Sequence, residues 1–152
     1  MKNLIAIAAL AATCLALPSY AATDAECAAM WNDIKKSNND VLSDSESLRY
    51  AAAMRVRDYK LPADGKVTRQ TFIDACKADV FVASTPDSGA PLKGANSFTE
   101  GQAKDRAVAR GFTSVSDLKK DGDGIWRGSA MLDGKTTQIA VDFKGNVVSQ
   151  SQ

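Results

Sequence analysis

Apolar residues recur at helical spacing in three stretches between residues 24 and 81. The first stretch carries Cys27, Met30, Trp31 and Ile34 at positions i, i+3, i+4 and i+7, the spacing of one buried helix face. Each stretch also begins at a residue type that caps helices. We therefore expect three helices. Their caps are Thr23, Ser43 and Thr68. The inward-facing residues of the second helix are Leu48, Ala51, Ala52, Met54 and Val56, and those of the third are Phe72, Ile73, Cys76 and Val80.

The pattern changes after residue 96, where one helical stretch is followed by alternation. Thr99 and Gln102 form a capping box, so we expect a helix over residues 100–110. The Asp133-Gly134 pair is typical of a hairpin turn between two strands. The predicted strands cover residues 113–119, 124–132 and 136–143. Together with the three earlier helices, this pattern predicts an α+β fold in which the later helix packs on an antiparallel meander.

Alternation along the last two predicted strands assigns side chains to faces. Ile139, Val141 and Phe143 point one way, and the residues between them, Ala140 and Asp142 among them, point the other way. On the preceding strand, Trp126 shares a face with Ala130 and Leu132. We therefore expect Trp126 in the core, while its neighbour Arg127 faces solvent.

Residues 1–21 have the features of a secretory signal peptide. Lys2 supplies the positive charge, an apolar stretch follows, and Ser19-Tyr20-Ala21 forms a small-x-small cleavage site. We expect cleavage before Ala22 and a mature protein in the periplasm or outside the cell. The apolar stretch is too short to span a bilayer and no second one follows, so no membrane span is expected. Cys14 leaves an alternative open, in which the chain is lipidated there and tethered to a membrane.

Loss of the leader leaves two cysteines, Cys27 and Cys76. An even number of cysteines in an oxidising compartment predicts a disulfide. Both residues lie on the core-facing stripes of predicted helices, so the bond would join the first helix to the third. Closing a loop of about 50 residues stabilises a small domain by about 4 kcal/mol in the chain-entropy model.

Residues 82–96 are rich in Gly, Pro, Ser and Ala, lack apolar periodicity and predict a linker. The linker divides the mature chain into a helical domain over residues 22–81 and an α+β domain over residues 97–152. The whole chain has 19 basic and 18 acidic residues, and the leader contains one of the lysines, so the mature chain is formally neutral. No basic block or basic-aromatic stripe is present, and nucleic acid is therefore not expected as a partner.

The chain contains no histidine. This removes the commonest general base and the commonest transition-metal ligand. Ser-His-Asp and Cys-His arrangements are excluded, and a disulfide would leave no free thiolate nucleophile. Carboxylate chemistry remains, but the acidic residues are scattered over turns and caps. A non-catalytic protein without a cofactor is therefore favoured over an enzyme.

Two loops between the first three helices resemble EF-hand calcium loops. In the later loop, Asp64 and Gly65 are followed by a hydrophobic residue, Val67, and by the exiting helix. In the earlier loop, over residues 35–46, Leu42 occupies the hydrophobic position and Glu46 the closing position. The resemblance covers about residues 24–81 and implies a short β-contact between the loops.

Several positions depart from the EF-hand pattern. Lys35 and Lys60 occupy the opening positions, and in the later loop Pro62 and Thr71 replace further ligands, including the closing glutamate. The later loop is not expected to bind calcium. One hypothesis for the earlier loop is that Lys35 pairs with Glu46 and replaces the charge of the ion. The alternative is a weak calcium site there, with the ligands Ser37, Asn39, the backbone carbonyl of Val41, Ser43 and Glu46.

The last predicted strand, the turn around Gly145-Asn146 and the closing Val147-Val148 pair resemble the PepSY family of small extracytoplasmic domains. The resemblance covers about residues 97–149. It implies a binding or inhibitory module that works near secreted peptidases or in the cell envelope, and it supplies no catalytic residues. We therefore expect a protein or peptide partner in the envelope. The residues that would contact an acidic partner are Lys119, Lys120 and Arg127.

Overall fold

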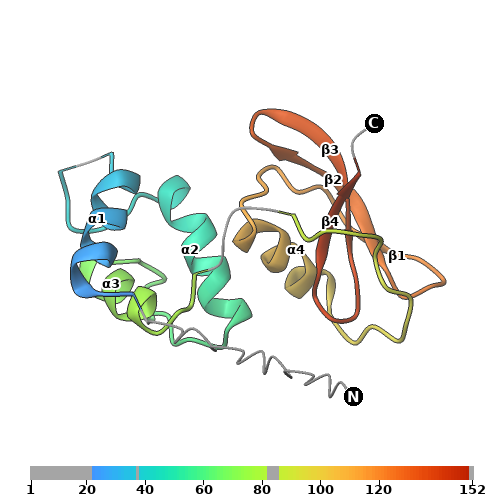
Figure 1. Cartoon of the computed structure of the whole chain (residues 1–152), viewed down its shortest axis with the longest axis horizontal. Helices are drawn as coiled ribbons and strands as arrows, with labels where there is room; N and C mark the ends of the chain where they lie inside the picture. Colours follow the sequence, from blue (N-terminus) through green and yellow to red (C-terminus); the bar gives the residue numbers. More distant parts are fainter. Residues whose placement is uncertain (1–21, 37, 82–85, 151–152) are drawn as a thin grey trace, which may run out of the picture.

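The computed structural model describes residues 22–36, 38–81 and 86–150, and within them it contains four helices and a four-stranded antiparallel sheet (Figure 1). The expected α+β class is confirmed. The strands pair in sequence order, as a meander. The proposed leader, with Cys14, and Ser37 lie outside the described residues. The elements are α1 Asp24–Ile34, α2 Asp44–Val56, α3 Arg69–Lys77, α4 Glu100–Ala109, β1 Lys119–Lys120, β2 Trp126–Leu132, β3 Lys135–Val141 and β4 Val147–Gln150.

All four helices begin directly after the capping residue that the sequence predicts. The side chains of Thr23, Thr68 and Thr99 each accept a hydrogen bond from the backbone N–H three residues later. At the start of α2, Ser43 donates its backbone N–H and its hydroxyl to Glu46. These bonds satisfy backbone groups that a helix terminus leaves unpaired, which is why short-range sequence fixes where these helices start.

The three N-terminal helices enclose an aromatic core. The Trp31 and Phe72 rings lie 5.5 Å apart, and the Tyr50 ring meets Phe72 edge-on at 5.0 Å. Two residues expected in this core are exposed instead: Met30 is 39% exposed and Leu48 is 59% exposed. Met30 lies beside the buried line of α1. Leu48 lies one turn before the part of its helix face that other elements cover.

In the C-terminal half, α4 packs on one face of the sheet through small side chains. Ala103 and Ala107 are fully buried among Ile139, Val141 and other strand residues. Small residues let the helix approach the sheet closely. Trp126 packs against this core as expected, and its indole N–H donates to the carbonyl of Phe98 at 3.2 Å.

The prediction of a strand over residues 113–119 is wrong. Only an isolated bridge between Thr113 and Met131 and the two-residue strand β1 are present in this segment. Ser114 has a φ of +49°, a left-handed conformation that interrupts an extended strand. The chain nevertheless stays alongside β2, since the Ser116 N–H donates to the carbonyl of Ser129 at 2.9 Å.

Residues 86–96, which we call the strap, lie against the sheet without forming a helix or strand (Figure 1). Asp87 and Val147 exchange two hydrogen bonds of 2.7 Å, from the Asp87 N–H to the Val147 carbonyl and from the Val147 N–H to the Asp87 carboxylate. The Leu92 N–H donates to Asp142 at 3.1 Å. On this second face of the sheet Ala140 and Asp142 are buried, so the strap contributes to a face that alternation alone would leave open.

The helical half, which comprises α1–α3, and the sheet half, which comprises the strap, α4 and β1–β4, meet along α2 and α4 (Figure 1). Arg55 on α2 forms a bidentate ion pair with Asp105 on α4, with N···O distances of 2.6 and 2.7 Å. Arg49 donates from Nε to the carbonyl of Ala109 at 3.4 Å, and Ala109 itself is buried with the helical core. Nowhere in the described part of the chain is a helix long and apolar enough to cross a membrane.

Candidate functional site

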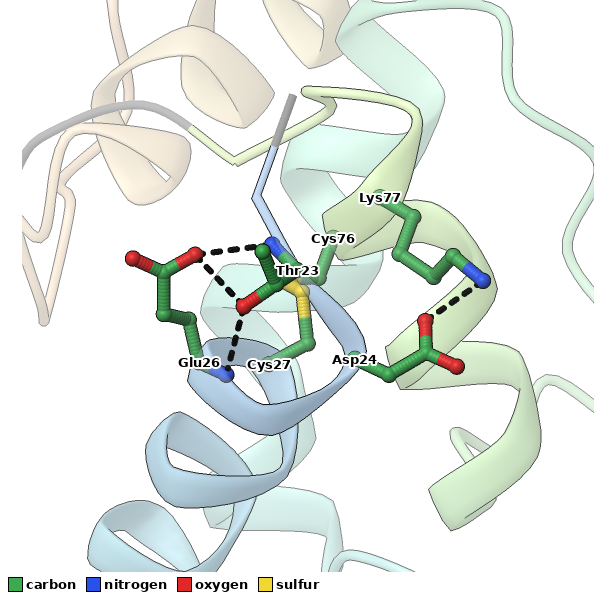
Figure 2. Close-up of a disulfide and its surroundings, with 6 residues drawn as sticks. All are labelled: Thr23, Asp24, Glu26, Cys27, Cys76 and Lys77. Carbon is green, nitrogen blue, oxygen red and sulfur yellow. Dashed lines mark hydrogen bonds and ion pairs between the residues drawn. A yellow bond between two sulfur atoms is a disulfide. The ribbon is translucent and has the colours of Figure 1, made fainter. Parts of the chain in front are cut away.

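The expected disulfide is present and joins the start of α1 to the end of α3 (Figure 2). The Cα atoms of Cys27 and Cys76 are 5.9 Å apart, and the two residues are 0% and 5% exposed. Next to the bond, Lys77 pairs with Asp24 at 2.5 Å, on the exposed side of the two helices. A buried disulfide is consistent with an oxidising, extracellular environment.

The two EF-hand-like loops lie side by side. The Leu42 N–H donates to the Val67 carbonyl at 3.0 Å, and the Arg69 N–H donates to the Asp40 carbonyl at 2.9 Å. These bonds form an isolated antiparallel bridge between Val41 and Thr68. The hydrophobic positions of the two loops therefore pair, and Leu42 and Val67 are both buried in the helical core.

The carboxylate of Glu46, the closing residue of the earlier loop (residues 35–46, called the first loop below), already accepts hydrogen bonds from protein donors. One oxygen accepts the backbone N–H of Lys36 at 2.7 Å, and the other accepts the N–H and hydroxyl of Ser43 at 2.8 and 2.7 Å. Hydrogen bonds from the Ser43 side chain and backbone, and then from the Lys36 backbone, lower the pKa of Glu46. In place of the hypothesised pairing with the Lys35 ammonium, Glu46 accepts the backbone N–H of Lys36.

Of the other proposed calcium ligands, Asn39 is exposed and Val41 is held in the bridge to Thr68. Across residues 22–36, 38–81 and 86–150, no three acidic or cysteine side chains converge in a way that could hold a metal ion. The weak calcium site therefore stays a prediction.

The three basic residues singled out in the sequence come together at the β1 edge of the sheet. Lys119 lies opposite Arg127 in the register, so the two share one face, and both are exposed. Lys120 lies on the other face, where its ammonium is 5.2 Å from the centroid of the Trp126 ring. Arg127 donates from Nε to Asp121 at 2.6 Å. This bond is the main cause that lowers the pKa of Asp121.

A surface pocket of about 460 Å³ lies beside this edge, between the end of the strap and the turn at residues 121–124. Lys93 pairs with Asp123 across its rim at 3.0 Å. Asn96 and Lys120 also line it. Asn96 is 8% exposed, and its Nδ2 atom has no hydrogen-bond partner among the described residues. The sequence did not point to Asn96, because the strap that carries it offers no periodic pattern.

Asp142 is a second buried polar residue to which the sequence did not point. It is fully buried and accepts hydrogen bonds from the N–H groups of Leu92, Lys144 and Asn146 and from the Asn146 side chain. Burial by itself raises the pKa of Asp142, but the bonds from Asn146, Leu92 and Lys144 together lower it. The charged carboxylate therefore joins the strap to the turn between β3 and β4.

Comparisons with protein-family models, with curated proteins and with solved structures find no significant match to this chain. The resemblances to EF-hand loops and to PepSY domains therefore stay predictions. The geometry itself separates the candidate residues into two groups. The calcium candidates lie in the helical half, whereas the basic residues and the pocket lie at the β1 edge of the sheet.

Proposed function

We propose that this protein is an extracytoplasmic, non-catalytic binding module that recognises an acidic segment of a protein or peptide in the cell envelope. The observation that carries the proposal is the exposed pair of Lys119 on the edge strand β1 and Arg127 on its neighbour β2, side by side on one face of the sheet. An edge strand also offers unpaired backbone groups to an incoming chain. Basic side chains beside such an edge would give the encounter its charge specificity.

The charge balance at this edge supports the proposal. Lys93 and Arg127 are each paired with one aspartate of the turn at residues 121–124. Lys119 and Lys120 form no ion pair among the described residues. The nearby carboxylate of Asp117 is paired with Lys104, which is the main cause that lowers its pKa, and the charge of Lys119 contributes only a small part. The edge therefore carries excess positive charge in a chain that is otherwise almost neutral. The resemblance of residues 97–149 to PepSY domains favours an envelope partner, with a secreted peptidase as the class to test first.

Affinity capture with matched charge variants tests this proposal. The mature protein, the variant Lys119→Gln/Arg127→Gln and the control Lys60→Gln/Lys66→Gln would be immobilised and exposed to an envelope extract. The control removes two exposed charges from the helical half. We expect a protein that wild type and control retain, that the edge variant loses, and that elutes as ionic strength rises. Equal capture by both variants would overturn the proposal, provided that circular dichroism shows both to be folded.

A calcium-responsive protein is the alternative. The bridge between Val41 and Thr68 favours it, since paired loops are what calcium-binding helix pairs use. The engaged carboxylate of Glu46 favours the calcium-free interpretation, because calcium would have to displace the Lys36 and Ser43 donors. A melting temperature measured in calcium and then in chelator separates the two, because a ligand of the native state must raise it.

A further inference from the structure

We propose that the pocket between the strap and the turn at residues 121–124 is a carboxylate-binding site. In it, the side-chain amide of Asn96 and the ammonium of Lys120 would hold a carboxylate from the partner. The inference rests on the proposed function and names the chemical group that the β1 edge recognises. An acidic side chain and a C-terminal carboxylate both present this group.

The first observation is the unpaired amide of Asn96. Its Oδ1 atom accepts the N–H of Phe98 at 3.0 Å, which fixes the orientation of the side chain and leaves Nδ2 as the free end. Nδ2 is buried and has no partner among the described residues. Buried donors are nearly always paired in folded proteins, so an unpaired one at a pocket wall indicates that an acceptor belongs there.

The second observation is the charge of Lys120. Its Nζ atom donates to the carbonyl of Asn96 at 3.1 Å and lies over the Trp126 ring, which keeps the ammonium at the pocket. Neither contact neutralises its charge. The other charged residues that line the pocket are already paired, Lys93 with Asp123 and Asp121 with Arg127. An acceptor that satisfies both donors is therefore expected to be anionic. A carboxylate has two oxygens and can accept from both donors at once.

Binding requires a small movement of the strap, because Nδ2 has almost no exposed surface in this structure. Before Asn96, the end of the strap is joined to the turn by one backbone bond, from the Gly94 N–H to the Asp123 carbonyl at 3.0 Å, and by the largely exposed Lys93–Asp123 pair. Exposed ion pairs contribute little to stability. An outward shift of residues 93–95, which leaves the Lys120 bond to the Asn96 carbonyl in place, would therefore open a path to the amide.

An NMR titration of the ¹⁵N-labelled mature protein tests this inference with three small probes. N-acetylglutamate amide carries only a side-chain carboxylate, N-acetylalanine carries only a terminal one, and N-acetylglutamine amide carries none. We expect saturable shifts of the Asn96 side-chain amide and of residues 93–96 and 121–124 with at least one carboxylate probe. The probe that binds more tightly identifies the source of the carboxylate. Equal shifts with the glutamine probe, or no saturable shift with any probe, would overturn the inference and leave a hydrated pocket.

Three variants show whether the named atoms are responsible. Asn96→Asp keeps the acceptor for the Phe98 N–H but replaces the Nδ2 donor with a negative oxygen. We expect binding about tenfold weaker for Asn96→Asp and for Lys120→Gln, and less than about twofold weaker for Lys135→Gln. Lys135 is the control, because it is an exposed lysine of the same sheet that neither lines the pocket nor belongs to the proposed recognition edge. Equal effects at Lys135 and Lys120 would reduce the binding to general charge attraction and refute the site.

The two proposals fail separately. If an envelope partner requires Lys119 and Arg127 but none of the small carboxylates binds, the pocket inference is wrong and the binding module stands. If the carboxylates bind in the pocket but capture does not depend on the edge residues, the proposed recognition surface is wrong.

Discussion

The helical half and the sheet half close their folds with different chemistry. In the helical half a covalent bond joins Cys27 to Cys76, 49 residues further along the chain. In the sheet half the buried carboxylate of Asp142 joins the strap through Leu92, 50 residues before it. Small domains bury too little apolar surface to be very stable, so a long-range tie matters in each. The comparison shows that a disulfide and a well-paired buried charge can serve the same structural purpose.

Removal of the disulfide is expected to have the largest effect. Cys27→Ala/Cys76→Ala should destabilise the helical half by about 4 kcal/mol, because the unfolded chain regains the freedom that the closed loop removed. The chain has two tryptophans, Trp31 in the helical half and Trp126 in the sheet half. Urea unfolding of variants that keep only one tryptophan therefore follows each half by fluorescence. We expect the Trp31 transition to move much further than the Trp126 transition, and equal shifts would show that both halves unfold as one unit.

Asp142→Ala should act on the other half. It leaves four donors without their acceptor, which we expect to cost about 3 kcal/mol in the free energy of unfolding reported by Trp126. Asp33→Ala is the control, because Asp33 is exposed on α1 and should change stability by less than about 0.5 kcal/mol. An unchanged Trp126 transition in Asp142→Ala would mean that the buried carboxylate does not hold the strap.

The contribution of Asp142 should depend on pH. Burial raises the pKa of Asp142, but the hydrogen bonds from Asn146, Leu92 and Lys144 outweigh it, so the folded pKa lies below the unfolded one. The stabilisation is therefore complete above the unfolded value of about 3.9 and is lost as the pH falls through the folded pKa. We expect the stability difference between wild type and Asp142→Ala to narrow below about pH 4. A difference that stays constant into acid would contradict this assignment.

A smaller effect on stability is expected when the glutamates of the two capping boxes, Glu46 and Glu26, are replaced by glutamine. At Glu46 both oxygens accept protein donors, whereas at Glu26 one oxygen accepts both donors of Thr23. Glutamine has one acceptor oxygen, so Glu46→Gln should lower the melting temperature, whereas Glu26→Gln should leave it almost unchanged. Thermal unfolding should show the same decrease in the melting temperature of Glu46→Gln in calcium and in chelator. If calcium raises the melting temperature of wild type but not that of Glu46→Gln, the first loop is a calcium site after all.

The smallest effect is expected at Leu48. Because its side chain is 59% exposed, Leu48→Ser should change the free energy of unfolding by less than about 0.5 kcal/mol. Leu42→Ala, at a residue that is 4% exposed, is the matched comparison and should cost about 2 kcal/mol or more. Urea denaturation measures both, and a large loss at Leu48 would contradict its exposed position in this structure.

Sequence patterns predicted the helices well because their signals are local. Thr23, Ser43, Thr68 and Thr99 bond to groups three residues away, so a short window contains the whole motif. Periodicity alone did not decide how far a helix face is covered, and Leu48 was therefore misplaced. The strand over residues 113–119 failed because Ser114 is left-handed, a conformation that its residue type does not signal.

The candidate site was predictable only in part. Lys119 and Arg127 were found because they are charged residues on a predicted sheet, and their pairing across β1 and β2 follows from the register. Asn96 and Asp142 depend on partners that are far away in sequence. The Lys120 ammonium that contacts Asn96 is 24 residues away, and the Leu92 amide that contacts Asp142 is 50 residues away. No local pattern specifies contacts over such separations.

The bond pair between Asp87 and Val147 has a consequence for the order in which the chain folds. The two residues are 60 positions apart, and Val147 belongs to the last strand of the sheet. The chain emerges N-terminus first, so the helical half is complete, with both cysteines present, well before that strand follows, and domains tend to fold in the order in which they emerge. The strap must therefore wait undocked until β4 arrives, which makes the sheet half the slower and more vulnerable part of a newly made molecule.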